Sequence, residues 1–251
     1  MIRIENIVKK YGDFTVIDNI SLKIKKGNIV SFIGPNGAGK STLLGIISRL
    51  TEFESGKVYI DDIELKDWNQ NELAKKISIL KQSNFLSMRL TIEELVSFGR
   101  FPYSQGRLTD EDWDYINNAI EYMKLRDIKD KYLDQLSGGQ RQRAFIAMII
   151  AQNTEYILLD EPLNNLDMKH SVEMMKILRN LVDDYGKTIV LVLHDINFAS
   201  CYSDYIFALK DGKVYKEGDI NVIITKEVLD NIYNIDFDIQ DIENKKICVY
   251  F

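Results

Sequence analysis

A glycine-rich segment near the start of the chain has the residue types and the spacing of a phosphate-binding loop. Gly34 and Gly39 frame it, and Lys40 and Ser41 follow at once. Glycines let backbone N–H groups turn towards phosphate oxygens, and the helix that follows presents its positive end to them. Lys40 should reach the β- and γ-phosphates, Ser41 should give its hydroxyl to Mg²⁺, and Thr42 can donate to the α-phosphate. The segment predicts a nucleotide site at Gly34, Pro35, Asn36, Gly37, Ala38, Gly39, Lys40, Ser41 and Thr42.

Three further polar residues lie at the ends of short apolar runs. Asp160 and Glu161 follow the run 156–159, and His194 follows the run 189–193. An acidic residue at the end of an apolar strand can hold magnesium through its water shell, which is the role that we predict for Asp160. Glu161 is the natural general base, because it could orient and deprotonate the attacking water for a gain of roughly a hundred- to ten-thousand-fold in rate. Each residue, taken singly, could be a solvated loop residue.

The elements that would position these residues are short strands. The apolar runs 29–33, 156–159 and 189–193 lack alternation, which is typical of strands buried on both faces of a parallel sheet. Ligands bind outside the carboxyl ends of such strands, so we expect the three loops to meet at one edge. Alternating stretches in the first part of the chain predict antiparallel strands beside this sheet. A helical insertion separates the first two runs, with Ser/Thr-x-x-acid helix starts at Thr91 and Thr109.

A second anion cradle is predicted where the helical stretch 141–152 begins. The segment before it contains a serine and two glycines, which at a helix N-terminus can bind an anion. Because the chain contains one phosphate loop, we expect a second copy of the chain to fill this cradle, in a head-to-tail twofold dimer. An ordinary helix cap is the alternative interpretation. The residues of the cradle are Ser137, Gly138, Gly139 and Gln140.

Composition limits the classes of function. The chain has 251 residues, of which 45% are hydrophobic and 28% are charged, as in ordinary globular domains. Its net charge of 32 − 38 = −6 disfavours nonspecific binding to nucleic acid. Cys201 and Cys248 form no CxxC pair and no signal peptide precedes them, so we expect reduced cytosolic thiols. The apolar stretches 145–151 and 189–193 are shorter than the roughly 18 residues that cross a bilayer, so any membrane role should be peripheral.

The combination of motifs resembles the nucleotide-binding subunits of ATP-binding cassette transporters. The phosphate loop, the segment 136–140, the triplet 160–162 and His194 follow the order of that family over nearly the whole chain. The resemblance implies that two ATP molecules, with Mg²⁺, are sandwiched between two such subunits. It also implies that ATP closes the pair and that hydrolysis reopens it.

The resemblance also implies the fold and its division. The expected fold class is α/β: a P-loop NTPase of the RecA-like type with a mostly parallel sheet flanked by helices, an antiparallel β subdomain and an inserted helical subdomain. We expect the RecA-like and antiparallel lobe to comprise residues 1–84 and 145–251, and the helical signature subdomain to comprise residues 85–144.

Several residues acquire roles only from this resemblance. Tyr11 falls where the family stacks an aromatic ring on adenine, although it could be a plain packing aromatic. Gln82 resembles the glutamine that links the magnesium site to the membrane partner, although it could be a solvated loop amide. His194 resembles the switch histidine that contacts the γ-phosphate.

The segment that follows the predicted general base resembles the loop that crosses the dimer interface. Asp167 would couple the two sites there. Asn164 and Asn165 depart from the commoner Ser-Ala or Thr-Ser pair of the family, which leaves individual contacts of this loop open.

Transport would require docking on separate pore proteins, because the chain has no predicted membrane span. We therefore expect a peripheral protein at the cytoplasmic face of the cell membrane, with membrane-spanning permease subunits as partners. The segment 83–104 is the expected docking region, although about half of its apolar side chains could fill the core of the helical lobe instead. These side chains are Phe85, Leu86, Met88, Phe98, Phe101, Pro102 and Tyr103.

Two segments indicate a subfamily. Residues 96–103 and 194–204 look like the variants found in bacterial importers of iron-siderophores, haem and vitamin B12. Iron-siderophore import is the commonest assignment for such sequences, with a substrate-binding protein as an indirect partner. The chain after about residue 215 is too short for an added regulatory domain.

Other classes of function stay open at this point. A cassette ATPase that acts on a soluble complex would bind soluble partners tightly. A kinase or a DNA-acting motor would share the phosphate loop, but neither explains the segment 136–140.

Overall fold

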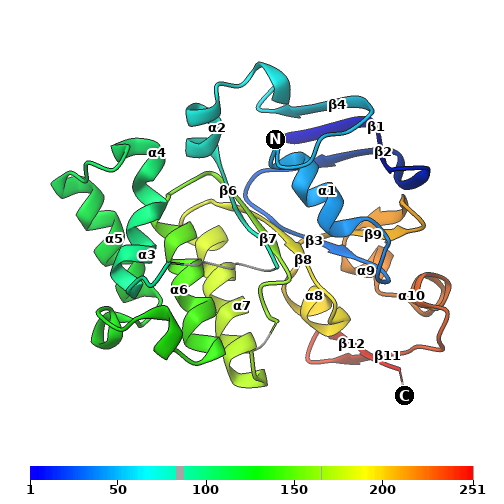
Figure 1. Ribbon diagram of the computed structural model, residues 1–251. Coiled ribbons are helices and arrows are strands. Elements are labelled where there is room, and N and C mark those ends of the chain that lie inside the picture. Colours follow the sequence, from blue (N-terminus) through cyan, green and yellow to red (C-terminus); the bar gives the residue numbers. More distant parts are fainter. Residues whose placement is uncertain (83–87, 165, 251) are drawn as a thin grey trace. The chain divides into compact units, whose positions relative to one another are not determined.

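The computed structural model describes residues 1–82, 88–164 and 166–250. Figure 1 shows the course of the chain, coloured from the N-terminus to the C-terminus. Within the described ranges, no helix has both the length and the apolar composition that a membrane crossing requires. Three residues singled out above lie outside the described residues, namely Phe85, Leu86 and Asn165.

The chain divides into two compact units, each of which is described by itself. Unit 1 comprises Met1–Trp68 and Ile177–Phe251, and unit 2 comprises Asn69–Lys176. The boundaries predicted from the family resemblance, at 84/85 and 144/145, stay a prediction.

Unit 1 contains an antiparallel sheet with the strand order β2-β1-β4-β5, drawn in blue to cyan in Figure 1. Its central strand β1 alternates buried and more exposed residues, so Ile2 and Ile4 lie on the buried face and pair with Ile24 and Leu22 of β2. Burying a side chain of this size contributes about 1.5–3 kcal/mol. The alternation in the sequence thus correctly predicts these strands. The bounds are β1 Ile2–Tyr11, β2 Phe14–Ile24, β4 Ser55–Ile60 and β5 Ile63–Glu64.

Unit 1 also contains the predicted buried parallel strands β3 and β8. The strand order is β10-β9-β3-β8, in which β3 pairs in parallel with both β8 and β9, whereas β10 is antiparallel to β9. Every residue of β3 and of β8 is buried, as the unbroken apolar runs predict. The bounds are β3 Ile29–Ile33, β8 Thr188–Val192, β9 Tyr205–Lys210 and β10 Lys213–Gly218.

The helices of unit 1 follow its strands, and the chain ends in a hairpin of β11 and β12. A 3₁₀ turn at Leu65–Asp67 follows β5, and α7 begins in unit 2 and ends in unit 1. The bounds are α1 Lys40–Ile47, α7 Met168–Asp183, α8 Ile196–Tyr202, α9 Ile220–Ile223, α10 Lys226–Tyr233, β11 Asp238–Ile242 and β12 Lys245–Val249.

Unit 2 combines two parallel strands, β6 and β7, with a set of helices. Both predicted helix starts are confirmed, because Thr91 and Thr109 form capping boxes with Glu94 and Asp112. The bounds are α2 Gln70–Lys76, β6 Ile77–Leu80, α3 Ile92–Ser97, α4 Phe101–Ser104, α5 Asp110–Tyr122, α6 Gly138–Ala151 and β7 Tyr156–Asp160, with 3₁₀ turns at Phe98–Arg100, Arg126–Ile128 and Leu133–Gln135.

A buried ion pair fixes the start of α5 in unit 2. The Arg100 Nε group donates to Asp112 Oδ1 at 2.8 Å, and Arg100 Nη1 donates to the Ala151 carbonyl at 3.0 Å. Burial raises the pKa of the Asp112 carboxyl, but hydrogen bonds from Thr109 and Arg100 outweigh it and hold this pKa below its usual value. The carboxylate is therefore charged and joins α5 to Arg100, whose second contact reaches the last residue of α6.

Candidate functional site

The phosphate loop of unit 1 connects the end of β3 to the start of α1. Gly34 has a φ of +139°, and a Cβ atom there would lie 2.1 Å from the Leu209 carbonyl oxygen of β9. Gly39 has a φ of +94°, and its Cβ would lie 2.9 Å from the Val16 carbonyl oxygen of β2. Both positions therefore require glycine, because of backbone conformation and because of the close approach of neighbouring strands.

Lys40 turns back over the loop that precedes it. Its side chain is buried, and Nζ donates to the carbonyl oxygens of Gly34 at 2.8 Å and of Pro35 at 2.9 Å. The first turn of α1 contains no acidic residue, so no side chain there neutralises the positive end of the helix. The ammonium group thus lies inside the loop that the sequence assigns to phosphate. Ser41 and Thr42 follow in the same turn of α1.

The other predicted residues of unit 1 are His194 and Tyr11. The loop that carries His194 leaves β8 at the same edge as the phosphate loop leaves β3, because the two strands are parallel. Asp195 then caps α8 by accepting from the backbone N–H groups of Asn197 and Phe198, which leaves His194 exposed between β8 and α8. Tyr11 ends β1 and is 55% exposed, and Lys9 Nζ lies over its ring, 5.0 Å from the centroid. Its stacking on adenine stays a prediction.

Unit 2 brings together three residues around the predicted general base. Asp160 is the last residue of β7 and Glu161 follows it; each is only 9% exposed, and Glu161 has a φ of +52°. Gln82 Nε2, which follows β6, donates to Glu161 Oε2 at 2.6 Å. Asn164 Nδ2 donates to the same oxygen. Two carboxamides therefore hold one oxygen of the Glu161 carboxylate.

Asn164 is the contact that sequence reasoning missed. The family resemblance marks it only as a departure from the common pattern, whereas the structure places its amide on Glu161. The signal that could have found it is its place three residues after the base, with Pro162 between them, where a turn brings the side chain back. A backbone hydrogen bond from Asn164 N–H to the Glu161 carbonyl, at 3.2 Å, closes that turn.

The second predicted anion cradle is the N-terminus of α6. Ser137 Oγ accepts from the Gln140 N–H at 3.3 Å, and Gln140 Oε1 accepts from the Ser137 N–H at 3.1 Å. This capping box fits the alternative interpretation of an ordinary helix cap. Ser137 and Gly138 are exposed, so the same helix end is also accessible to an anion. Gln142 Nε2 donates to the Pro162 carbonyl at 2.9 Å and ties α6 to the loop after Glu161.

Asp167 precedes α7 and interacts with a residue that no sequence motif marks. Its Oδ1 accepts from the His170 N–H and contacts His170 Nδ1, each at 2.8 Å. The hydrogen bond from the His170 N–H is the main reason that the pKa of the Asp167 carboxyl lies below its usual value. The predicted role of Asp167 in coupling two sites stays a prediction.

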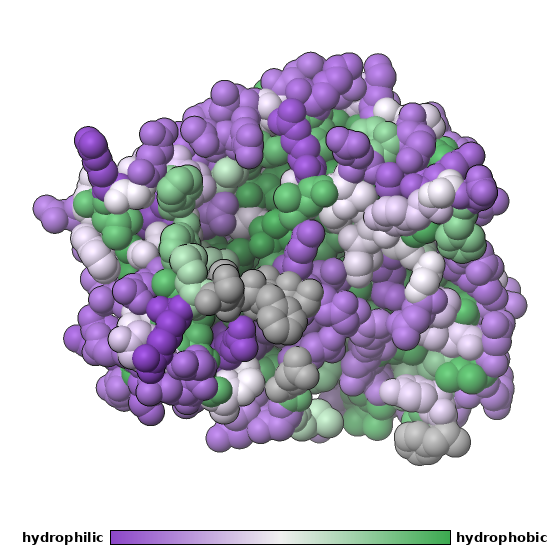
Figure 2. All heavy atoms as spheres, viewed as in Figure 1, coloured by the Kyte–Doolittle hydropathy of each residue, from purple (hydrophilic) through white to green (hydrophobic). Residues whose placement is uncertain are grey.

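Large apolar side chains of the expected docking region are exposed. Met88, Phe98, Phe101 and Tyr103 are all exposed in unit 2, so they do not fill its core. Pro102 is half-buried. Figure 2 shows apolar surface among hydrophilic side chains on the face in view. The described part of the segment thus retains accessible apolar surface that a partner could cover.

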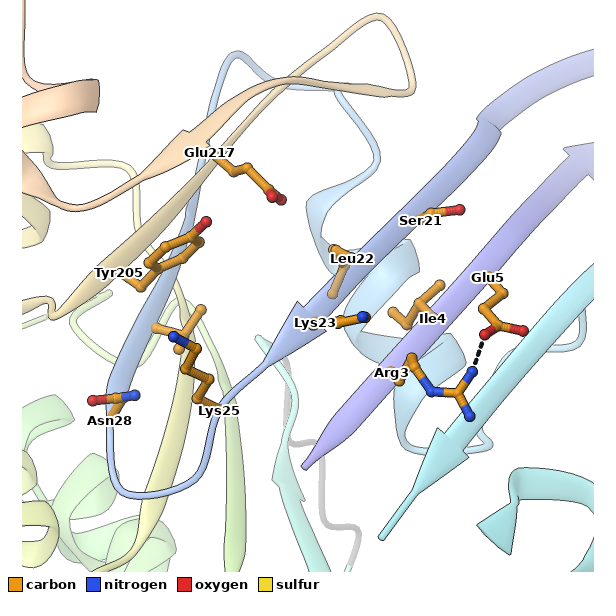
Figure 3. Close-up of a pocket in the computed structure, with 11 residues that line it drawn as sticks. Arg3, Ile4, Glu5, Ser21, Leu22, Lys23, Lys25, Asn28, Tyr205 and Glu217 are labelled. Atoms are coloured by element: carbon orange, nitrogen blue, oxygen red, sulfur yellow. Dashed lines mark hydrogen bonds and ion pairs between the residues drawn. The ribbon is translucent and has the colours of Figure 1, made fainter. Parts of the chain in front are cut away.

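A separate hollow of about 460 Å³ lies in unit 1. Figure 3 shows side chains from several strands around it, among them Lys23, Lys25, Tyr205 and Glu217. It opens at the start of β3 and β9, whereas the phosphate loop leaves the end of β3. None of the predicted nucleotide-binding residues lines it, so this hollow is separate from the predicted nucleotide site.

The chain is similar in sequence to known proteins over most or all of its length. Residues 17–164 match the family model described as ABC transporter. The petrobactin import ATP-binding protein YclP of Bacillus subtilis (strain 168) is 63% identical over 251 residues, which is 100% of both chains. The iron(3+)-hydroxamate import ATP-binding protein FhuC of the same organism is 40% identical over 245 residues, 96% of this chain and 91% of that protein.

A solved structure confirms the predicted fold class. It is the dimeric structure of a post-hydrolysis state of the ATP-binding cassette MJ0796 bound to ADP and Pi. The likeness has a TM-score of 0.78 at 35% identity and covers 88% of this chain and 99% of that one. The α/β fold with parallel and antiparallel strands and inserted helices, predicted from the motifs, is therefore correct.

Proposed function

Since the chain belongs to the ABC transporter family, we propose that the ATP it hydrolyses powers import of an iron-siderophore through separate membrane-spanning permease subunits. Membership makes the chain an ATP-binding and ATP-hydrolysing subunit and excludes the kinase and the DNA-acting motor. The observation that supports this choice of transported molecule is the 63% identity, over the full length of both chains, to a protein named for petrobactin import. Ferric petrobactin is therefore the first candidate cargo.

The phosphate loop is the proposed binding site for the triphosphate of ATP. Its backbone N–H groups and the positive end of α1 would face the phosphate oxygens, and Lys40 would exchange its carbonyl partners for the β- and γ-phosphates. His194 would contact the γ-phosphate and Tyr11 would stack on adenine.

Magnesium is the metal that the chemistry of the donors fits. The Ser41 hydroxyl and the Asp160 carboxylate are hard oxygen donors, and Mg²⁺ takes one or two such protein ligands besides waters and phosphates. Gln82 offers a third oxygen through its carboxamide. When bound, the ion neutralises charge that develops on the phosphates.

Glu161 is the proposed general base of hydrolysis. It would accept a proton from the water that attacks the γ-phosphate, and the amides of Gln82 and Asn164 would fix the direction of its carboxylate. A near-complete burial of this carboxylate keeps the number of competing solvent contacts small.

Each complete centre would take the phosphate loop from one copy of the chain and the segment from Ser137 to Gln140 from the other. The dimeric cassette structure supports pairing. Mixing equal amounts of a Lys40→Ala chain and a Ser137→Ala chain should restore about a quarter of the wild-type turnover, because about half of the pairs are mixed and one of the two centres in each mixed pair has both parts intact. Equal inactivity before and after mixing would contradict shared centres.

The proposed partners are permease subunits, and through them a substrate-binding protein, at the cytoplasmic face of the membrane. The exposed side chains Met88, Phe98, Phe101 and Tyr103 are the proposed contact surface, within the proposed helical subdomain 85–144.

Uptake of radioactive iron tests the cargo directly. Cells that lack the chain should lose uptake of ferric petrobactin, and the wild-type chain should restore it, whereas a Glu161→Gln chain should not. Ferric hydroxamate, haem and vitamin B12 serve as alternative cargoes in the same cells. Loss of one of these uptakes instead would replace the proposed cargo, and recovery of the chain only with soluble proteins would replace the transport role.

A further inference from the structure

The C-terminal part of unit 1 contacts the phosphate loop directly. Tyr233 is the last residue of α10, and its hydroxyl accepts a hydrogen bond from the Gly34 N–H at 3.0 Å. The two residues are 199 positions apart in the sequence. No motif of the sequence assigns a role to this part of the chain. A tyrosine hydroxyl thus meets the first residue of the loop that binds phosphate.

The end of α10 is anchored to the strand that lies against Gly34. Asn234 follows the helix as its C-cap with a φ of +58°, and its Oδ1 accepts from Lys210 Nζ at 3.3 Å. Lys210 Nζ also donates to the Asn231 carbonyl. Lys210 is the last residue of β9, and its neighbour Leu209 provides the carbonyl that excludes any side chain at position 34. The same strand end therefore positions both partners of the hydrogen bond.

The Tyr233 ring is held by an aromatic cluster. Its centroid lies 5.9 Å from that of Phe237, which in turn lies 5.3 Å from that of Tyr250. Phe237 is fully buried, and its N–H donates to Asp230 Oδ1 at 2.8 Å, back on α10. Aromatic pairs at these distances are favourable beyond the area they bury. The ring therefore has little freedom to move its hydroxyl away from the loop.

The hydrogen bond from Gly34 to Tyr233 provides an acceptor for a buried backbone N–H group at the start of the loop. Gly34 is buried, and a buried backbone N–H without an acceptor is unfavourable. Burial of Tyr233 raises the pKa of its hydroxyl, and this outweighs the opposing effect of the Gly34 N–H. The phenol therefore stays neutral, so the contact is a hydrogen bond to an uncharged acceptor over the physiological pH range.

We propose that Tyr233 is a positioning residue for the phosphate loop: its hydroxyl fixes the Gly34 backbone at the point where β3 becomes the loop, and so holds the loop open for the triphosphate. This inference rests on the proposed function of that loop. Tyr233 does not itself touch the nucleotide. Its effect reaches ATP through the orientation of the backbone from Gly34 onwards.

The test is Tyr233→Phe, which removes the hydroxyl and keeps the ring. We expect the Kd for a fluorescent ATP analogue and the KM for ATP to rise about two- to tenfold, which is the usual effect of one neutral hydrogen bond. The kcat at saturating ATP should stay at the wild-type value. Tyr215→Phe is the matched control, because Tyr215 is an exposed tyrosine of β10 in the same unit, and it should leave both constants unchanged.

Two further variants distinguish an error in the positioning role of Tyr233 from an error in the proposed nucleotide site. Lys210→Ala loosens the anchor of α10 and should raise the Kd in the same direction by a smaller factor. Lys40→Ala should weaken binding severely, and a normal Kd in that variant would mean that the loop is not the nucleotide site at all. If Lys40→Ala loses binding while Tyr233→Phe retains the wild-type Kd, the positioning role is wrong. The positioning role is also wrong if Tyr233→Phe lowers only kcat and thermal stability, because that pattern indicates loss of folded protein.

Discussion

The phosphate loop of unit 1 and the loop after β7 in unit 2 are built in different ways. In the phosphate loop, each of these hydrogen bonds involves a backbone group of the loop. Lys40 Nζ donates to two backbone carbonyl oxygens, and the Gly34 N–H donates to the Tyr233 hydroxyl. In the loop after β7, side chains make them, because the carboxamides of Gln82 and Asn164 hold Glu161. The first loop is thus shaped for an anion by its backbone, whereas the second depends on the identity of individual side chains.

This difference predicts how each half responds to substitution. Changes in the loop after β7 should act on turnover and spare ATP binding. Changes in the phosphate loop should act on ATP binding first.

The largest effect is expected for Glu161→Gln. The change keeps the size of the side chain and removes the proton acceptor, so turnover should fall about a hundred- to ten-thousand-fold. Phosphate release measures the rate, and size-exclusion chromatography with ATP should show an accumulated dimer. ATP affinity should remain near the wild-type value. A monomer with full turnover would contradict the role of Glu161 as the base.

The second largest effect is expected for Lys40→Ala, and it should be an effect on ATP binding. Loss of a charged hydrogen-bond donor to phosphate should raise the Kd for ATP about ten- to a hundredfold. Calorimetry with ATP and Mg²⁺ measures this value. Lys216→Ala, at an exposed position of β10, is the control and should bind normally. Equal affinities in the two variants would show that the loop does not hold the triphosphate.

Of the three variants that compare the two loops, Asn164→Ala should have the smallest effect. Glu161 would keep the hydrogen bond from Gln82 and lose the one from Asn164, so kcat should fall about three- to tenfold with an unchanged Kd for ATP. Asn118→Ala, at an exposed position of α5, should have no effect. A higher Kd without a change in kcat would place Asn164 with the binding groups and remove the distinction between the two loops.

Much of the fold was predictable because local patterns determine it. The unbroken apolar runs of β3, β7 and β8 are buried strands, and the threonines at 91 and 109 begin helices through contacts only three residues long. The phosphate loop was also predictable from local sequence, since Gly34 and Gly39 have positive φ and the Lys40 side chain contacts carbonyl groups only five and six residues back.

The missed contacts join distant parts of the sequence or follow an unusual local turn. Tyr233 meets Gly34 across 199 positions, and no periodicity in the C-terminal segment indicates which residue it will reach. Gln82 and Glu161, 79 positions apart, were assigned to one site by resemblance, but their direct hydrogen bond was not. Asn164 reaches Glu161 because of the turn after β7, in which Glu161 has a φ of +52°. The first two contacts depend on tertiary packing, which the local sequence does not encode, whereas the contact of Asn164 with Glu161 is local and depends on the conformation of one turn.

The position of Lys40 has a consequence for selectivity. Its ammonium has already left bulk water and is solvated by two amide oxygens of its own chain. An anionic ligand would therefore compete with those two oxygens for the N–H groups of the Lys40 ammonium. A singly charged metabolite gains little from that exchange, whereas the dense negative charge of a triphosphate gains much. If Lys40 binds the triphosphate as proposed, this competition should disfavour weak anions independently of any contact with the base or the sugar.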